Sequence, residues 1–398
     1  MATYDVIIIG AGAAGLMCAA TAGYQGKRVL VLDHANKAGK KILMSGGGRC
    51  NFTNLDAGPA NFFSRNPHFC ISALKRYTPH HFLELVERHG LEHVEKKPGQ
   101  LFCADSAKDL LAILMTECEW AGAEIRLSTR ITSLERAGEG MRVETSNGTH
   151  TAGRVVVATG GMSIPTLGAT GFGYDIARQF GLEVTDTYAA LVPFTLTSQW
   201  KERLSPLSGL ACDVSVTAGK GHYREPMLIT HRGLSGPAML QASSWWTPGQ
   251  PLDIDLLPGV DAYAELLALR EQHPKRQIGP WLGERLPKRL AQSLVEWQDA
   301  DAGRISERSL AELSNARLEQ LAKALNHWQL KPAGTEGWRT AEVTMGGVVT
   351  DAISQKDFSV RDLPQLAFIG EVLDVTGELG GYNFQWAWSS AVACGLNC

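Results

Sequence analysis

The chain has 398 residues, of which 44% are hydrophobic and 20% are charged, and its formal net charge is −3. This length and composition predict a globular protein of two or three domains with an ample core. The charge balance excludes a global basic field for nucleic acid, although a local basic patch remains compatible with it. The eight cysteines include no Cys-x-x-Cys pair, so we expect no metal site and reduced thiols in a cytoplasmic protein.

The first element is a strand over 4–9 that runs into a glycine-rich turn and a helix of small residues. Gly10 allows the tight turn, Gly12 lets the backbone approach a pyrophosphate, and Gly15 lets helix and strand pack closely. A second strand, 28–32, ends at an acid placed to meet a ribose hydroxyl. Together they predict a dinucleotide site formed by Gly10, Gly12, Ala13, Ala14, Gly15 and Asp33.

The same N-terminal segment, 6–26, carries no charge and has the length of a membrane span or a signal peptide. Glycines interrupt it, and no basic stretch precedes it. The strand–turn–helix pattern explains it fully, so we expect no membrane segment.

A glycine-rich loop with cationic and amide side chains follows over 39–54. Such a loop lets the backbone pass close to a flat ring or a phosphate and offers many hydrogen-bond donors. The alternative is a surface loop of turn residues. As a cofactor loop it would contribute Lys41, Ser45, Gly46, Gly47, Arg49, Cys50 and Asn51.

The apolar spacing then predicts a helical region and a series of strands. Asn147-Gly148 predicts a hairpin turn, and the strand 154–158 stops at Thr159, Gly160 and Gly161, where it would present backbone to a ligand. The predicted elements before this strand are helices over 67–90 and 107–121 and strands over 124–127, 131–134 and 141–144.

The pattern changes after Leu191, where strand-like runs over 192–254 give way to helical stretches over 261–328. A strand over 366–371, ending in glycine and acid, and a helix over 382–393 follow. This order predicts a nucleotide-binding domain from 1–190 and 336–398, with a domain of strands and then helices inserted at 191–335.

Three separated segments indicate FAD rather than NAD: the glycine turn, 158–161 and 368–381. A NAD dehydrogenase would continue from one Rossmann half to a substrate domain. In glutathione-reductase-like flavoproteins, by contrast, an acid after a late strand reaches the ribitol chain and the last helix points its N-terminus at the flavin. There is no second strand–Gly-x-Gly-x-x-Gly–helix unit, so NAD(P)H is expected as a transient reductant, with another electron carrier as the alternative.

With the loop 39–54 and the motifs at 230–237, 339–348 and 370–385, the whole chain resembles the BaiN/RdsA (YhiN-like) flavoprotein family. The resemblance implies an α/β fold, namely a glutathione-reductase-like FAD-binding Rossmann domain with an inserted β-barrel plus helical domain. It also implies reduction of a conjugated C=C bond. One branch acts on bile-acid enones, and another makes dihydrouridine in large-subunit (23S) ribosomal RNA. Closeness over 40–54 and 69–77 favours the ribosomal RNA branch.

The same resemblance extends the cofactor residues to the later motifs. The superfamily's final aspartate is matched by Glu371, which leaves the ribitol contact open between Glu371 and Asp374. The residues carried over are Thr159, Gly160, Gly161, Gly370, Glu371, Asp374, Gly381, Tyr382 and Asn383.

Reduction of a C=C bond also needs an acid to protonate the neighbouring carbon. The candidates are Cys50, Cys103, His231 and Tyr382, of which Cys50 and His231 are preferred as catalytic residues. Cys50 follows Arg49 and a glycine loop, a setting that can lower a thiol pKa. A buried cysteine and a structural histidine are the alternative interpretations.

Two other features have both a structural and a functional interpretation. Trp245-Trp246 and the pair Trp386 and Trp388 can stack on a base or a ring, but core packing is favoured for both. The basic clusters 275–276 and 285–289 can form an RNA-binding face on the inserted domain or an ordinary solvated helix face.

Three functions therefore compete. The first is an FAD enzyme that reduces uridine in ribosomal RNA, the second an oxidoreductase of a small enone or quinone-like metabolite, and the third a flavin-bearing RNA-binding protein with a minor redox role. The oligomeric state is open.

Overall fold

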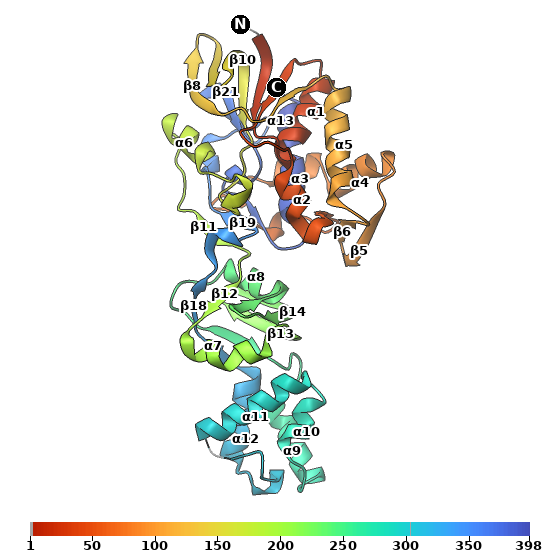
Figure 1. The fold of residues 1–398 in the computed structure, drawn as a ribbon, viewed down its shortest axis with the longest axis vertical. Helices are drawn as coiled ribbons and strands as arrows, with labels where there is room; N and C mark the ends of the chain where they lie inside the picture. Colours follow the sequence, from red (N-terminus) through yellow and green to blue (C-terminus); the bar gives the residue numbers. More distant parts are fainter. Residues whose placement is uncertain (1–2, 303) are drawn as a thin grey trace. The chain divides into compact units, whose positions relative to one another are not determined.

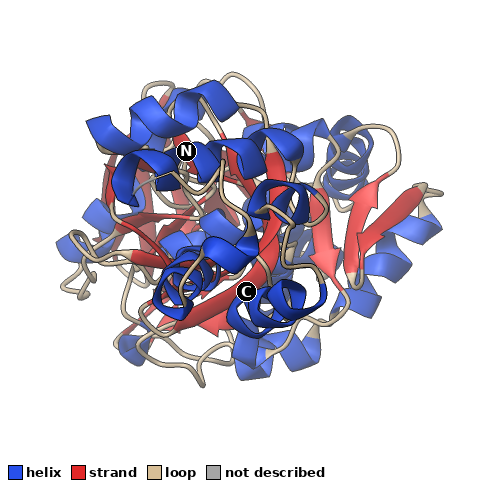
Figure 2. Ribbon diagram, turned by 90° about the horizontal axis from the view of Figure 1, so that it is seen from below, coloured by secondary structure: helices blue, strands red, loops and turns tan. Residues whose placement is uncertain are grey.

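The computed structural model describes residues 3–302 and 304–398, which form two compact units. The first unit comprises Met1–Ala189 and Glu342–Cys398, and the second comprises Ala190–Ala341. The chain returns to the first unit at Glu342, later than the boundary expected at 335, so the short 3-10 helix Gly337–Arg339 that follows β18 (Pro332–Thr335) also belongs to the second unit. Helices and strands both occur along the whole chain (Figures 1 and 2).

The first unit is built on a largely parallel sheet with the strand order β20-β21-β10-β1-β2-β7. β1 pairs in parallel with both β10 and β2, and Val6, Ile7 and Ile8 in its centre are fully buried. A strand covered on both faces needs a continuous apolar run, which explains the N-terminal sequence. The strands of this sheet are β1 (Thr3–Ile9), β2 (Val29–Leu32), β7 (Glu124–Arg126), β8 (Ile131–Ala137), β9 (Gly140–Thr145), β10 (Gly148–Val157), β20 (Ser359–Val360) and β21 (Leu363–Phe368).

The helices of the first unit join segments far apart in sequence. The N-terminal helix α1 packs directly against the last helix, α13 (Figure 1). The approach is close because a Cβ on Gly395 of α13 would lie 2.7 Å from the Cβ of Thr21. The helices are α1 (Ala13–Tyr24), α2 (Lys40–Met44), α3 (Ile71–Arg76), α4 (Pro79–Arg88), α5 (Ala107–Trp120), α6 (Phe172–Gln179) and α13 (Tyr382–Gly395).

The single helical region expected over 67–90 is wrong, since α3 and α4 are separate helices. Thr78 between them is extended, with φ −87° and ψ 167°, and it caps α4. Pro79 occupies the first turn of α4, and a proline disfavours the helical conformation in the residue before it.

Short strands hold the remaining loops of the first unit together. β22 pairs with β4 and so ties a late segment of the chain to an early one. β3 pairs with β6, and β6 pairs with β5. These strands are β3 (Asn51–Asn54), β4 (Phe62–Phe63), β5 (His93–Lys97), β6 (Gln100–Cys103), β22 (Thr376–Gly377) and the ladder of β11 (Tyr188–Ala190) with β19 (Val343–Met345).

The second unit has its own core, around a seven-stranded sheet in the order β17-β16-β13-β14-β15-β12-β18. Lys331 alone separates β17 from β18, so both ends of the sheet lie on adjoining segments of chain. No ladder joins those two strands among the described residues, and the expected closed barrel is therefore not shown. The strands are β12 (Phe194–Leu196), β13 (Ala211–Ala218), β14 (Gly221–Ile229), β15 (Gly233–Ser235), β16 (Leu252–Asp255), β17 (Trp328–Leu330) and β18.

The helices of the second unit fall in two groups along the chain. Two short helices lie among the strands, and four follow β16, as the helical sequence pattern predicts. They are α7 (Ser198–Leu204), α8 (Pro237–Ser243), α9 (Ala262–Gln272), α10 (Ile278–Gly283), α11 (Lys288–Ala302) and α12 (Asn315–Asn326). Within the described residues of both units, every helix is too short or too polar to cross a lipid bilayer.

Candidate cofactor site

The glycine turn after β1 is shaped by two positions that exclude a side chain. Gly10 has a φ of 113°, and a Cβ there would lie 2.4 Å from the carbonyl oxygen of Ala158. A Cβ on Gly15 would lie 1.8 Å from the carbonyl oxygen of Gly10. A Cβ on Gly12, by contrast, would meet no described atom within 4 Å. The backbone at Gly12 therefore borders open space into which a ligand can approach.

The N-terminus of α1 opens onto this space. Gly12 is its N-cap and has no side chain to cap the helix, and the first turn has no acidic residue. The free N–H groups and the positive end of the helix dipole therefore remain available to an anion. At the end of β2, the Asp33 carboxylate accepts from the backbone N–H of Ala11 at 2.8 Å and of Ala35 at 2.7 Å. Asp33 is thus held beside the turn, where a ribose would lie next to the pyrophosphate.

The loop after α2 presents bare backbone. Gly46, Gly47 and Gly48 have φ values of 57°, 68° and 84°, a region that glycine occupies without strain. A Cβ on Gly47 or Gly48 would meet no described atom within 4 Å. Ser45 donates to the carbonyl of Ile42 at 2.8 Å and so closes the end of α2. This loop offers a second open backbone surface.

Cys50 does not have the lowered pKa that its sequence setting suggests. Its side chain is fully buried, and this burial raises the pKa of the thiol to about 12. Arg49, the residue expected to lower that pKa, is exposed. Burial likewise raises the pKa of the neighbouring Cys103 to about 11. The lowered pKa was wrong, because two thiols in a protein interior lack the solvation that a thiolate needs.

The end of β10 carries the third predicted segment. Gly160 has a φ of 70°, and a Cβ there would lie 3.8 Å from Oε2 of Glu371. A Cβ on Gly161 would lie 2.9 Å from Oε1 of Glu371. Thr159 is packed closely, because its Oγ1 would lie 2.2 Å from a Cβ on Gly173. Glu371, which follows β21, therefore faces the glycines that follow β10.

A polar network fixes Glu371 from the other side. Lys41 donates from Nζ to Oγ of Ser163 at 2.7 Å and to Oε2 of Glu371 at 2.8 Å. The backbone N–H of Thr344 donates to Oε1 of Glu371 at 2.9 Å. Sequence reasoning found Lys41 and Glu371 but missed Ser163 and Thr344. The only signal for these two was their place beside Gly161 and inside the motif 339–348.

Asp374, the other acid in this region, forms a hydrogen bond with the backbone of an earlier segment. Asp374 accepts from the backbone N–H of Arg65 at 2.9 Å, and burial raises the pKa of its carboxyl. Asn383 bridges its own loop, since it accepts from the N–H of Gly377 at 2.8 Å and donates to the same residue's carbonyl. Both residues therefore shape the loop before α13.

The N-terminus of α13 meets the glycine-rich loop. Gly381, its N-cap, has a φ of 96°, and a Cβ there would lie 2.5 Å from the carbonyl of Thr53. With its amide oriented to satisfy its neighbours, Asn51 accepts from the N–H of Gly381 at 3.3 Å. Tyr382 follows in the first turn, half-buried, with its ring edge-on to Phe62 at 6.3 Å. A second uncapped helix start thus lies beside the loop 45–51.

The motif at 370–385 also contacts the start of α1, next to the glycine turn after β1. Gly370 has a φ of 73°, and a Cβ there would lie 3.0 Å from the Cβ of Ala14. The first unit therefore brings together the turn after β1, the loop after α2, the end of β10 and the start of α13. Between them they offer the N–H donors of two helix N-termini and bare glycine backbone, and the acceptor carboxylates of Asp33 and Glu371, a set that fits a dinucleotide with a ribitol chain.

The remaining predicted residues lie in the second unit. His231 is exposed in the turn between β14 and β15, beside Arg232, whose guanidinium lies 3.6 Å from the carboxylate of Glu336. Trp245 donates to the hydroxyl of Tyr223 at 2.7 Å and Trp246 to the carbonyl of Gln250 at 2.7 Å, so the pair serves packing, as favoured.

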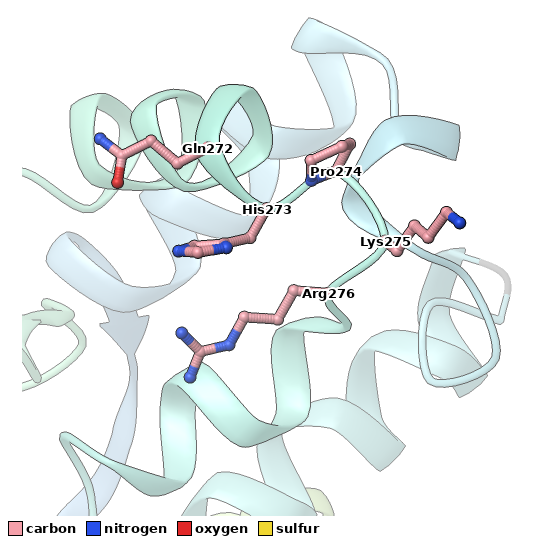
Figure 3. A pocket seen from close by; sticks show the side chains of 5 residues that line it. All are labelled: Gln272, His273, Pro274, Lys275 and Arg276. Atoms are coloured by element: carbon pink, nitrogen blue, oxygen red, sulfur yellow. The ribbon is translucent and has the colours of Figure 1, made fainter.

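Two of the five cations in the basic clusters of the second unit, Arg276 and Arg285, form ion pairs with acids. Arg276 pairs with Glu284, and Arg285 lies 2.6 Å from Glu265 and also near Glu284. Figure 3 shows the loop after α9, where a hollow of about 560 Å³ is lined by five residues. These are Gln272, His273, Pro274, Lys275 and Arg276. Lys275 and Arg276 bring two positive charges to this hollow, and the ion pair with Glu284 offsets that of Arg276.

The sequence matches the family described as "HI0933-like protein Rossmann domain" over residues 4–397. It is 50% identical to the ribosomal RNA dihydrouridine synthase of Escherichia coli over 395 residues, which cover 99% of this chain and 98% of that protein. The protein of the same name from Haemophilus influenzae is 47% identical over 397 residues, covering 98% of this chain and 97% of that protein.

A more distant relative and a solved structure extend the comparison. The 3-dehydro-bile acid delta(4,6)-reductase of Clostridium scindens is 29% identical over 405 residues, covering 98% of this chain and 97% of that protein. The structure titled "Mycobacterium smegmatis Sdh1 complex in the apo form" has a TM-score of 0.50 and 16% identity, over 99% of this chain and 67% of that chain, which shows a shared fold. The predicted Rossmann-type α/β fold and the family resemblance are both confirmed. The chain belongs to the HI0933-like Rossmann family of flavin-dependent oxidoreductases.

Proposed function

We propose that this protein binds FAD and reduces the C=C bond of uridine in large-subunit ribosomal RNA to give dihydrouridine. The observation that carries the proposal is the 50% identity, over almost the full length of both chains, to a protein named ribosomal RNA dihydrouridine synthase. The open backbone of the first unit supports the cofactor part of the proposal.

The FAD would be held by residues of the first unit alone. The N-terminus of α1 and Gly12 would receive the pyrophosphate, and Asp33 the adenosine ribose. Glu371, rather than Asp374, would take the ribitol chain, because Glu371 faces the open glycine backbone at Gly160 that follows β10. Lys41 would keep the Glu371 carboxylate oriented through its 2.8 Å contact. When bound, the flavin supplies the hydride that is added to one carbon of the double bond.

The proton for the other carbon would come from a residue that substrate can reach. Cys50 and Cys103 are fully buried, so substrate cannot reach either thiol and neither is suited to the role. Tyr382 is half-buried in the first turn of α13, within the unit that holds the other cofactor residues. We therefore rank Tyr382 first and the exposed His231 second.

Substitution of the acid should separate the two half-reactions. In Tyr382→Phe we expect flavin content and its reduction by NADPH to stay unchanged, while reoxidation by RNA slows by about 100-fold or more, the typical contribution of a general acid. Stopped-flow absorbance of the flavin measures both rates. Cys50→Ser is the comparison and should reoxidise normally. Slow reoxidation in His231→Asn alone would assign the acid to His231. Normal rates in Tyr382→Phe, Cys50→Ser and His231→Asn would exclude all three residues as the acid.

The second unit would contribute to RNA binding through its positive charge. The loop 275–276 and the segment 285–289 supply positive charge, although ion pairs with Glu265 and Glu284 reduce it. We therefore expect a modest salt dependence of RNA affinity, set by few phosphate contacts. A small enone is the second candidate substrate, since the relative from C. scindens is named as a bile-acid reductase.

The direct test is anaerobic. The purified protein is reduced with NADPH or NADH, its flavin spectrum is recorded, and ribosomal RNA from cells lacking the gene is added. Flavin reoxidation together with dihydrouridine detected by mass spectrometry would support the proposal, and RNA from the parent strain, already modified, is the matched control. Reduced flavin that ignores RNA but is reoxidised by an enone would transfer the proposal to a small substrate. Salt-sensitive RNA binding without turnover would indicate a binding protein instead.

A further inference from the structure

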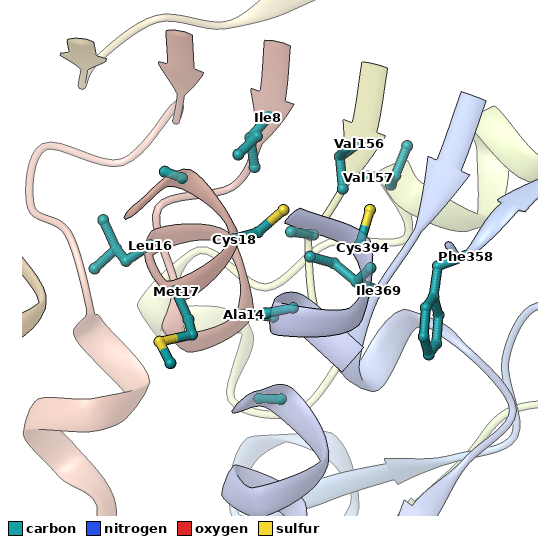
Figure 4. Close-up of a cluster of buried hydrophobic side chains, with 14 of the residues drawn as sticks. Ile8, Ala14, Leu16, Met17, Cys18, Val156, Val157, Phe358, Ile369 and Cys394 are labelled. Carbon is teal, nitrogen blue, oxygen red and sulfur yellow. The ribbon is translucent and has the colours of Figure 1, made fainter. Parts of the chain in front are cut away.

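Three cysteines far apart in the sequence come together between α1 and α13. Cys18 lies on α1, Cys394 in the last turn of α13, and Cys398 just beyond that helix. Their Sγ atoms all lie within 4.8 Å of one another, and those of Cys394 and Cys398 are 3.9 Å apart. Figure 4 shows Cys18 and Cys394 in the buried cluster that these helices share. The sequence pattern gave no sign of this group, because two ligands are four residues apart and the third lies near the other end of the chain.

We propose that Cys18, Cys394 and Cys398 form a metal site that takes one Zn²⁺ ion, or its analogue Cd²⁺, through three thiolate ligands. Zn–S bonds of about 2.3 Å in a tetrahedron place sulfur atoms about 3.8 Å apart. The Cys394–Cys398 pair already has that spacing, and Cys18 needs a shift of at most about 1 Å toward it. Cys398 is half-buried, whereas Cys18 and Cys394 are buried, so an ion would enter from the side of Cys398.

The charges around the cluster suit a divalent ion. Three thiolates and one Zn²⁺ leave a single net negative charge. The guanidinium of Arg154 lies alongside, where it donates to the carbonyl of Asn397 at 2.8 Å and lies 3.6 Å from Asp357. The protons of the three thiols would leave to solvent as the metal binds.

Metal at this position would join two helices that both start at the cofactor site. α1 and α13 begin at Gly12 and Gly381 and pack together near Thr21 and Gly395. An ion that binds only the folded arrangement stabilises it by mass action. The site would thus cross-link the middle of α1 to the C-terminal end of α13, and it is independent of which substrate the enzyme reduces.

The test uses the flavin-loaded protein, reduced with a phosphine, treated with EDTA and desalted. Zn²⁺ is titrated in competition with a chromophoric chelator, and Cd²⁺ is followed by its thiolate charge-transfer absorption in the ultraviolet. We expect one ion per chain and a rise in melting temperature with Zn²⁺. Cys394→Ser and Cys398→Ser should each weaken binding by at least about 100-fold, the effect expected for loss of one ligand of three.

Cys118→Ser is the matched control. Cys118 is also buried against α1, where its Sγ donates to the carbonyl of Leu16 at 3.2 Å, but it lies outside the cluster. It should bind Zn²⁺ as the parent does. Cys398→Ser keeps the test decisive if Cys394→Ser fails to fold, because Cys398 is half-buried and beyond the helix. Absence of stoichiometric binding, equal affinity in Cys398→Ser, or a Cys394–Cys398 disulfide that persists in place of a metal site would each overturn the proposal.

Discussion

Gly12→Ala is expected to give a folded protein that has lost most of its flavin. A Cβ at this position meets no described atom within 4 Å, and Gly12 has a φ of −90°, which alanine adopts freely. The protein alone should therefore tolerate the change. The new methyl group would instead occupy the space through which a pyrophosphate approaches the N-terminus of α1. We expect FAD affinity to fall by at least about 100-fold, equivalent to about 2.7 kcal/mol.

The measurement is flavin absorbance per chain after gel filtration, together with the melting temperature of protein stripped of flavin. Gly279→Ala in α10 is the matched control, because a Cβ there also meets no described atom within 4 Å. It should keep both flavin and stability. Gly15→Ala should behave differently from both, since its Cβ would lie 1.8 Å from the carbonyl oxygen of Gly10 and the turn itself must distort. Parental flavin content in Gly12→Ala would show that the turn does not hold the cofactor.

Trp388→Ala is expected to have the largest effect on folding. The side chain is fully buried in α13 and stacks on Phe82 with ring centroids 4.4 Å apart and planes 7° apart. Its indole N–H donates to the carbonyl of Phe52 at 2.8 Å. Truncation of a buried tryptophan costs about 3–5 kcal/mol, and leaving the carbonyl unpaired adds about 1 kcal/mol or more. That sum approaches the whole stability of a typical domain, which is about 5–15 kcal/mol.

The urea midpoint, followed by near-ultraviolet circular dichroism, measures this loss. Trp388→Phe separates the contributions, because it keeps a ring against Phe82 but removes the N–H donor, and it should be intermediate. Trp120→Ala is the control, since Trp120 is 65% exposed and its only described ring partner is His89. Its midpoint should change little. A shift in Trp388→Ala no larger than in Trp120→Ala would rule out the packing role given to α13.

The parts of the fold that the sequence predicts are those with local causes. The strand, glycine turn and helix at 3–24 follow from neighbouring residues, and so does the acid after β2. The break between α3 and α4 also has a local signal at Thr78-Pro79, but the apolar spacing across 67–90 concealed it. The ladders β3–β6 and β4–β22 could not be predicted, because strands of two to four residues carry too little pattern and their partners lie far away in sequence.

The candidate site likewise contains residues that the sequence predicts and contacts that only the fold reveals. The glycines follow from backbone geometry that only glycine adopts, and their spacing is visible in the sequence. The contact of Lys41 with Glu371 joins residues more than three hundred positions apart, so only the fold reveals it. The burial of Cys50 was invisible for a similar reason: Arg49 points to solvent, while Cys50, with its unusual φ of 38°, is covered by distant parts of the chain.

The division of the first unit between two stretches of sequence has a consequence during synthesis. β21 is the parallel neighbour of β10 at Val155 and Val157, yet the ribosome makes it only after the entire second unit. At about 5–20 residues per second, that interval lasts about 10 s or longer. During this time the edge of β10 lacks its partner and is a site for wrong pairing. The second unit is contiguous in sequence and can complete its core before β21 and α13 are made. The proposed FAD site, which includes the start of α13, would therefore be completed only after that helix has been synthesised.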